Sequence, residues 1–400
     1  GEDIMRLLHS AYTMFMAENG LSPMAFPSLK AMENDVVAMT ASMLHGGETT
    51  AGTMTSGGTE SIFMAMKTAR EWARKHRPEI EKPKIVAPTT AHPAFVKSAH
   101  YLDMQIEFTG LLDDWRADPA AIETAIDHDT VIVVGSAICY PYGVVDPIGE
   151  IAAIAQARGI LMHVDACLGG FMLPFVSELG YTVPLWDFRV PGVTSISADI
   201  HKYGYAAKGA STVTYRDAEL RKLQFYAFAD WPGGIYVTPT MAGARPGGSV
   251  AAAWAVMHHL GRKGYLELAE VAMEATRRIR AGIESIDGLR IMGNPHMTVL
   301  AFDSDEVDVF TVGSKMDARG WHLDRNQLPQ ALHLMVTPAH SGVVEPLIAD
   351  LEASTAEARA EPSGAAEGMA ALYGAAAAMP DRGVVSDFAI AFMDEMYTPS

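Results

Sequence analysis

The residues with the clearest chemical potential are a histidine and a lysine, His201 and Lys202, which directly follow the β-branched segment 193–197. Such a segment predicts a short strand that ends in a polar turn. Burial disfavours the charged form of a lysine, and the neutral amine can form a Schiff base with an aldehyde. The pair therefore indicates either a nucleophilic lysine or an ordinary surface lysine beside a capping histidine. The dipeptide alone does not separate these interpretations.

Two glycines and a threonine, Gly57, Gly58 and Thr59, open a segment whose pattern predicts a helix. A helix that begins with small residues presents free N–H groups and the positive end of its dipole to an anion. The segment lacks the GxGxxG pattern, and no strand is clearly expected before it, so a dinucleotide site is not favoured. A cradle for one phosphate monoester and a plain glycine-flanked helix start both remain open.

Asp165 and His92 add a carboxylate and an imidazole to the candidate site residues. Asp165 ends the apolar segment 160–164, which predicts a buried strand, and His92 opens a predicted helix after the strand 84–87. A carboxylate at the carboxyl end of a strand faces the ligand in an open α/β sheet, although it can also cap a helix. An imidazole can cover an aromatic ring, and His92 is equally well interpreted as an ordinary helix-start residue.

The composition is that of a globular enzyme, with 400 residues, 49% of them apolar, and a net charge of −18. An acidic chain is repelled by nucleic acid and by anionic membranes, so neither is expected as a partner. Two cysteines, Cys139 and Cys167, cannot form a disulfide framework or a zinc site, which favours a reducing cytoplasm and no metal. No signal peptide or membrane-spanning segment is expected.

The order of the predicted elements defines the fold class. Predicted strands at 84–87, 104–108, 131–134 and 160–164 alternate with helices, which is typical of an α/β fold with an open, mainly parallel sheet. We expect a helical arm over residues 1–52, a large domain over 53–283 and a smaller C-terminal α/β domain over 284–400. Residues 359–380 are rich in alanine and glycine and predict a linker or a frayed helix.

The sequence resembles the sphingosine-1-phosphate lyase family, within the group of pyridoxal-phosphate-dependent decarboxylases that includes the glutamate and aromatic amino-acid enzymes. The blocks that carry the resemblance extend over most of residues 20 to 340. They are Thr55–Ser61, Ala91–His92, His163–Phe171, Asp187–Ser197, His201–Gly204, Ala242–Gly247 and Ile291–Pro295. The blocks DFRVPGVTSIS and HKYGYAAKG are the most specific.

The resemblance implies a fold-type-I enzyme with pyridoxal 5′-phosphate as its cofactor. Lys202 would bind the cofactor aldehyde, His92 would lie over the ring, and Asp165 would keep the ring nitrogen protonated. The cofactor phosphate would be bound by Gly57, Gly58, Thr59 and His201.

A second phosphate, that of the substrate, would be bound by Lys208 and Tyr140, and Tyr140 is also a candidate catalytic residue. Two positions depart from the family pattern. Ser22 stands where the family usually has a histidine that helps to recognise the substrate phosphate, and Ala244 stands where it usually has a serine that reaches the partner subunit's cofactor. Ser22 can donate one neutral hydrogen bond but no charge.

The implied reaction is retro-aldol cleavage of sphingosine 1-phosphate, or of a related phosphorylated long-chain base, to phosphoethanolamine and a long-chain aldehyde. The alternative is an amino-acid decarboxylase with the same cofactor. A third interpretation is a scaffold protein that has lost turnover, which the intact pair His201–Lys202 and Asp165 argue against.

The glycine-rich loop Met241–Gly248 bears on assembly. Glycines let the backbone closely approach a ligand or another subunit. The resemblance implies that this loop crosses to a second chain, and we therefore expect a homodimer with shared active sites.

Overall fold

The computed structural model describes residues 1–360 and 379–398. These form two compact units: Gly1–Met273 with Gly293–Met297, and Glu274–Met292 with the described part of Thr298–Ser400. Most of the expected linker at 359–380 lies outside the described residues. Within them, no helix combines the length and the apolar character needed to cross a bilayer.

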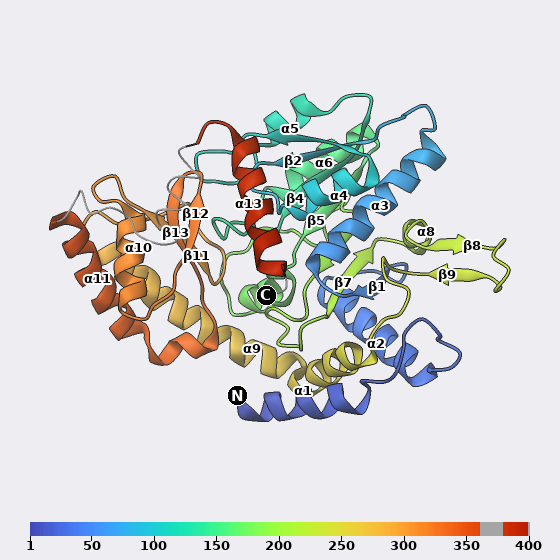
Figure 1. Ribbon diagram of the computed structural model, residues 1–400, viewed down its shortest axis with the longest axis horizontal. Helices are drawn as coiled ribbons and strands as arrows, with labels where there is room; N and C mark the ends of the chain where they lie inside the picture. The colour runs from blue at the N-terminus through green and yellow to red at the C-terminus, as the bar shows by residue number, and fades with distance from the viewer. Residues whose placement is uncertain (361–378, 399–400) are drawn as a thin grey trace. The chain divides into compact units, whose positions relative to one another are not determined.

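The first unit is built on a seven-stranded sheet with the order β1-β7-β6-β5-β4-β2-β3 (Figure 1). The five strands from β6 to β3 are parallel, and β7 runs antiparallel to both β6 and β1. The mainly parallel α/β sheet that the sequence predicts is thus confirmed. The strands are Ala51–Thr55 (β1), Lys84–Pro88 (β2), Gln105–Thr109 (β3), Thr130–Ser136 (β4), Leu161–Asp165 (β5), Ser195–Ala198 (β6) and Ser211–Tyr215 (β7).

The first strand, β1, corrects one expectation, since no strand was clearly expected before Gly57. Its sequence Ala-Gly-Thr-Met-Thr has neither an apolar run nor a clear alternation. The strand forms because it pairs antiparallel with β7, from Ala51 opposite Tyr215 to Thr55 opposite Ser211. A pairing between segments so distant in the chain leaves no local pattern in the sequence.

Helices pack against this sheet and connect its parallel strands. Alternating apolar residues of α3, with Phe95 of α4, bury against Ile85 and Val134 of the sheet. Local signals set the helix ends: Asp118 accepts hydrogen bonds from the first amides of α5, and Gly159 ends α6 with a positive φ of 62°. The helices are Gly58–His76 (α3), Ala94–Leu102 (α4), Pro119–Ala125 (α5), Ile148–Arg158 (α6), Gly169–Phe171 (η1), Leu173–Glu178 (α7) and Ala218–Lys222 (α8).

The same unit contains the N-terminal helices, a hairpin and a long helix. Leu8 is the one buried residue of α1, although α1 is strongly amphipathic. A single long element, α9, contains two helical segments that are separated by a break at Gly261, whose φ is 52°. The bounds are Glu2–Met14 (α1), Pro27–Met43 (α2), Tyr226–Phe228 (β8), Tyr236–Thr238 (β9) and Gly247–Ser285 (α9), whose last turns belong to the second unit.

The second unit is a small α/β unit with its own core. Its antiparallel four-stranded sheet has the order β10-β11-β13-β12. Phe302, Phe310 and Leu332 are at its centre. The elements are Arg290–Ile291 (β10), Val299–Asp303 (β11), Val309–Ala318 (α10), Asp324–Gln327 (β12), Gln330–Met335 (β13), Pro338–Gly342 (η2), Val344–Ala360 (α11) and Arg382–Tyr397 (α13).

Candidate active site

A cavity of about 430 Å³ lies where the carboxyl ends of β4, β5 and β6 meet the start of α3. Its volume is within the range of roughly 300–1,000 Å³ that is usual for small-molecule sites. Parallel strands bring their carboxyl ends to one edge of the sheet, which is why residues distant in the sequence meet here. The predicted residues that line this cavity are Gly57, Gly58, Thr59, His92, Tyr140, Asp165, His201 and Lys202.

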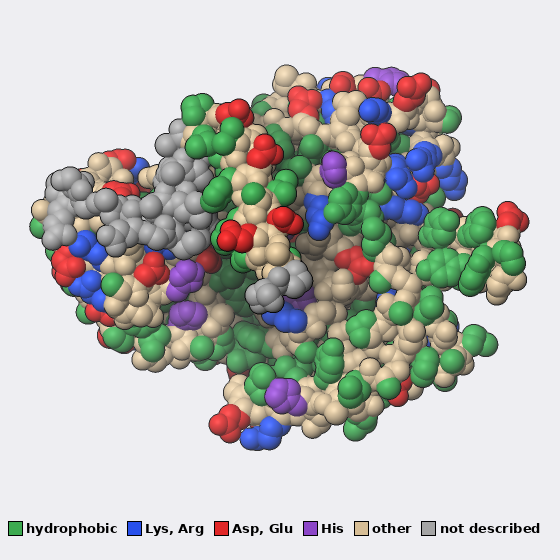
Figure 2. All heavy atoms as spheres, in the orientation of Figure 1, with side chains coloured by type: hydrophobic (Ala, Val, Ile, Leu, Met, Phe, Trp, Pro, Cys, Tyr) green, Lys and Arg blue, Asp and Glu red, His purple; other side chains and the backbone are tan. Residues whose placement is uncertain are grey.

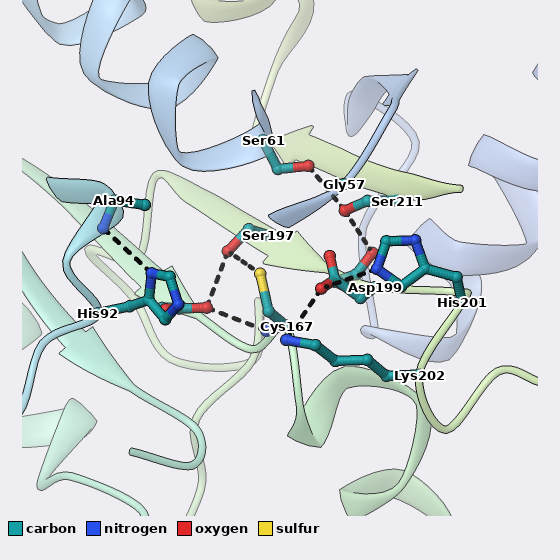
Figure 3. Close-up of polar contacts among 12 residues, drawn as sticks. Gly57, Ser61, His92, Ala94, Cys167, Ser197, Asp199, His201, Lys202 and Ser211 are labelled. Atoms are coloured by element: carbon teal, nitrogen blue, oxygen red, sulfur yellow. Dashed lines mark hydrogen bonds and ion pairs between the residues drawn. The ribbon is translucent and has the colours of Figure 1, made fainter. Parts of the chain in front are cut away.

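Lys202 forms an ion pair inside the cavity. Its Nζ lies 3.0 Å from Oδ2 of Asp199, and Figure 3 shows the two side chains directed toward each other. Burial was expected to lower the pKa of Lys202, and this expectation is wrong for the net effect. Burial acts in that direction, but the negative charges of Asp199 and Asp165 outweigh it and raise the pKa above the usual value of a lysine.

Asp199 lines the same cavity but was not among the residues predicted for the site. It follows β6, and its side chain is only 1% exposed. Burial would raise the pKa of Asp199, but hydrogen bonds and charge from His201, Lys202 and Ser211 hold it below the usual value. The available signal was its position three residues before Lys202, in the same polar turn.

Asp165 is held in place by its neighbours. Its Oδ1 accepts a hydrogen bond from the Cys167 backbone N–H at 3.0 Å and one from the Ser197 hydroxyl at 3.3 Å. Ser197 stands opposite Asp165 in the pairing of β5 with β6. Both hydrogen bonds engage the same oxygen, so the second carboxylate oxygen is available to accept a proton donor from a ligand.

The start of α3 forms a cradle for an anion. The N-cap residue of α3 is Gly57, which has no side chain to cap the first amides of the helix. A Cβ atom on Gly58 would lie 2.8 Å from Sγ of Cys167 and 2.9 Å from Oδ2 of Asp199. A side chain at this position would therefore force Cys167 or Asp199 to shift, which favours glycine here.

His92 and His201 are each oriented by a backbone amide. Nδ1 of His92 accepts a hydrogen bond from Ala94 N–H at 3.1 Å, at the start of α4. Nδ1 of His201 accepts one from Ala210 N–H at 3.2 Å, which leaves Nε2 3.5 Å from Oδ2 of Asp199. Figure 3 shows the two imidazole rings on opposite sides of the Lys202 amine.

Two predicted residues do not line this cavity. Lys208 is exposed, and its Nζ donates to the carbonyl oxygen of His201 at 3.3 Å. It lines a neighbouring cavity of about 590 Å³ that is bounded by α1, by the loop after Lys202 and by His201 and Lys202 themselves. Ser22 is exposed in the turn between α1 and α2. Within one chain, the structure therefore does not bring these two residues together with Tyr140.

The loop Met241–Gly248 lies against the start of α3 of its own chain. The backbone N–H of Met241 donates to Glu60 at 3.0 Å, and Arg245 forms an ion pair with Glu33 of α2. Ala244 lines a small cavity of about 50 Å³ together with Ser56 and Glu60. The loop is therefore next to the cradle but not inside the main cavity.

The donor set fits pyridoxal phosphate. The glycine cradle matches the phosphate, the available oxygen of Asp165 matches the ring nitrogen, and Lys202 matches the aldehyde. A mainly parallel sheet that places these groups in one cavity defines a fold-type-I pyridoxal-phosphate enzyme.

Comparisons with known proteins place the chain within this class. The model of the pyridoxal-dependent decarboxylase conserved domain matches residues 1–304. Sphingosine-1-phosphate lyase of Arabidopsis thaliana is 44% identical over 396 residues, which covers 98% of this chain and 73% of the relative. Sphingosine-1-phosphate lyase 1 of Rattus norvegicus is 41% identical over 398 residues, which covers 99% of this chain and 70% of the relative. The chain belongs to the pyridoxal-dependent decarboxylase family and, within it, to the sphingosine-1-phosphate lyases.

Solved structures agree with this assignment. The sphingosine-1-phosphate lyase of Burkholderia pseudomallei superimposes with a TM-score of 0.88 at 41% identity, covering 91% of this chain and 85% of that chain. Glutamate decarboxylase of Lactobacillus brevis has a TM-score of 0.78 at 20% identity, covering 90% and 86%, and shows the shared fold alone.

Proposed function

We propose that this chain is a carbon–carbon lyase that cleaves sphingosine 1-phosphate, or a related phosphorylated long-chain base, to phosphoethanolamine and a long-chain aldehyde. The observation that carries the proposal is the single cavity in which Lys202, Asp165 and the glycine cradle meet, in a chain of the sphingosine-1-phosphate lyase family. The bound cofactor supplies an electron sink for the carbon next to the substrate nitrogen.

Each residue has a stated task in this reaction. Lys202 would bind the cofactor aldehyde, Asp165 would keep a proton on the ring nitrogen of the cofactor, and His92 would lie over that ring. Gly57, Gly58 and Thr59, together with His201, bind the cofactor phosphate. Removal of the proton from the C3 hydroxyl breaks the C2–C3 bond, so that C3 leaves as the aldehyde carbon. C2 keeps the electron pair and then takes up a proton.

A turnover assay tests the proposal. The purified chain with added pyridoxal phosphate should release a long-chain aldehyde and phosphoethanolamine from sphingosine 1-phosphate in equal amounts, and Lys202→Ala should release neither. A panel of amino acids should yield no carbon dioxide. Carbon dioxide from an amino acid, with no aldehyde from the lipid, would favour the decarboxylase alternative. No turnover of any substrate, with the cofactor bound, would favour the scaffold.

We further propose which residues bind the substrate phosphate and that a second subunit completes each active site. Lys208, assisted by Tyr140 and Ser22, binds the substrate phosphate, and two chains complete each site. Exposed apolar side chains on the hairpin β8–β9 support the second chain: Tyr226 is 54%, Trp231 55% and Ile235 78% exposed. In Figure 2 these apolar side chains gather at the right-hand edge, where Figure 1 shows the hairpin. Such a patch is typical of a protein interface.

The cell compartment is also a proposal. Cys139 and Cys167 are both buried and unpaired with each other. Free thiols persist in a reducing compartment, which supports the cytoplasm.

A further inference from the structure

Asp199 is a buried carboxylate that none of the roles above uses. It lies on the turn between β6 and Lys202, and Oδ2 contacts two cations or potential cations, the Lys202 amine at 3.0 Å and His201 at 3.5 Å. Within the described part of the chain, Oδ1 of Asp199 has no hydrogen-bond partner. A buried carboxylate with an unsatisfied oxygen is strongly disfavoured unless an opposite charge compensates it.

The titratable groups around Lys202 come from several elements. Asp199 and His201 are on its own turn, Asp165 ends β5 and Cys167 follows it, His92 precedes α4, and Glu60 and Tyr140 line the same cavity. His9 of α1 and Lys208 line the neighbouring cavity, which Lys202 also borders. Three carboxylates, those of Glu60, Asp165 and Asp199, line this cavity, and Lys202 is the one lysine or arginine among its described lining residues. Lys202 in its charged form is therefore the compensating cation, and Asp199 is its direct partner at 3.0 Å.

We propose that Asp199 is a positioning residue that holds Lys202 as an oriented ammonium group until an aldehyde enters the cavity. Lys202 can act as a nucleophile only after its ammonium group loses a proton to solvent. The neutral amine then adds to the aldehyde carbon, and loss of water completes the Schiff base. An opposite charge at such a distance shifts a pKa by about 1–3 units. The raised pKa of Lys202 agrees with this assignment.

Asp199 also borders the phosphate cradle, because Gly58 would contact its carboxylate if it carried a side chain. A role at the phosphate, transmitted through His201, would leave the charge of Lys202 unaffected. The test must therefore use an aldehyde without a phosphate.

The experiment follows Schiff-base formation between pyridoxal, which lacks the phosphate, and the full chain freed of cofactor. The initial rate is measured by absorbance from about pH 7 to about pH 9.5, and the rate of Lys202→Ala is subtracted to remove other lysines. Below the pKa of the amine, the rate rises about tenfold per pH unit. We expect the wild-type rate to rise over the whole range without a plateau.

Asp199→Asn keeps the shape and removes the charge. For this variant we expect the rate of Schiff-base formation to reach its plateau at a pH at least about one unit lower than in the wild type. At neutral pH the variant should react roughly tenfold faster. Asp199→Glu, which keeps the charge, should behave like the wild type. Asp187→Asn is the matched control, because Asp187 is equally buried but pairs with Arg189 and His45 outside this cavity.

Three outcomes would overturn the proposal. One is a profile for Asp199→Asn that coincides with the wild type. Another is an Asp199→Asn variant whose affinity for pyridoxal phosphate changes while its rate profile with pyridoxal does not. Asp199 would then act at the phosphate. The third is a plateau below about pH 9 in the wild type itself, which can be measured even if Asp199→Asn does not fold.

Discussion

At the scale of single residues, the two strands that flank the active site share a polar chain. His163 is fully buried, and its ring nitrogens lie 2.9 Å from the Ser195 hydroxyl and 3.2 Å from the Ser197 hydroxyl. Ser197 in turn reaches Asp165. Burial lowers the pKa of His163 to about 4, against the charge of Asp165, so the ring is neutral near pH 7. A neutral His163 ring can orient Ser197 without adding a positive charge near Asp165 that would compete with the ring nitrogen of the cofactor.

The first prediction concerns Ser197→Ala. Removing the hydroxyl frees Oδ1 of Asp165 to reorient, and a hydrogen bond to a charged group contributes about 1.5–3 kcal/mol. We expect kcat to fall roughly tenfold or more with little change in KM. Asp165 would hold the ring nitrogen of the cofactor less well, while the contacts to the substrate stay intact. Steady-state kinetics measure this split. Ser195→Ala, which contacts the opposite side of His163, should retain wild-type kcat; equal losses in both variants would contradict the proposed role.

The second prediction concerns Lys208→Ala. If Lys208 binds the substrate phosphate, its loss removes a charge-assisted contact of about 1.5–3 kcal/mol and lowers kcat/KM about ten- to a hundredfold. The absorbance of the bound cofactor should not change, because Lys208 does not line the cavity in which Lys202, Asp165 and the glycine cradle meet. Full kcat/KM on the phosphorylated lipid would show that another group binds this phosphate.

At the scale of elements, the start of α3 depends on the absence of a side chain at Gly58. We predict that Gly58→Ala weakens cofactor binding roughly tenfold. The new Cβ atom would contact Cys167 and Asp199, and the resulting displacement of the cradle would cost about 1–3 kcal/mol. Absorbance titration of the chain with pyridoxal phosphate measures the affinity. Gly47→Ala is the matched control, since its Cβ would have no neighbour within 4 Å. An unchanged affinity in Gly58→Ala would mean that the phosphate binds elsewhere.

Some elements could be predicted and others could not. The parallel strands β4 and β5 are short apolar runs, and this local pattern was sufficient. Strand β1 has no such pattern and forms through its partner β7. The division of the chain at residues 52 and 283 stays a prediction.

At the scale of the whole molecule, one buried acid away from the active site links stability to pH. Asp146 is fully buried and accepts backbone hydrogen bonds from Ala117 at 2.8 Å and Ser136 at 2.7 Å. Burial raises the pKa of Asp146 to about 6, although these hydrogen bonds act in the opposite direction. In the unfolded chain the pKa is about 3.9. Between these values the folded protein binds a proton that the unfolded chain does not.

The contribution of Asp146 to stability is therefore fully present below about pH 4 and is lost as the pH rises through about 6. A shift of about two units corresponds to about 3 kcal/mol. We predict that Asp146→Asn, relative to the wild type, gains about this much unfolding free energy between pH 4 and pH 7. Urea unfolding at both pH values measures it, with Asp113→Asn as an exposed control. If the free energies of unfolding of variant and wild type differed by the same amount at both pH values, Asp146 would not have the raised pKa.

The last prediction concerns assembly. We expect a homodimer in sedimentation at micromolar concentration, and we expect Trp231→Asp to shift it toward monomer with loss of turnover, because a charge on the hairpin disfavours an apolar interface. Tyr181→Asp, at an aromatic residue that is 39% exposed but outside the hairpin, should remain dimeric. A fully active wild-type monomer would rule out shared active sites.

The sequence by itself determined the α/β class, the family and the group of residues that share the main cavity. It could do so because strand and helix periodicity is local, and because the carboxyl ends of parallel strands must meet at one edge. Only the tertiary structure decided that Lys202 is paired with Asp199, that its pKa rises, and that Lys208 and Ser22 lie outside the cavity. Charge and contact depend on distances between atoms and on burial, and neither can be read from the order of residues along the chain.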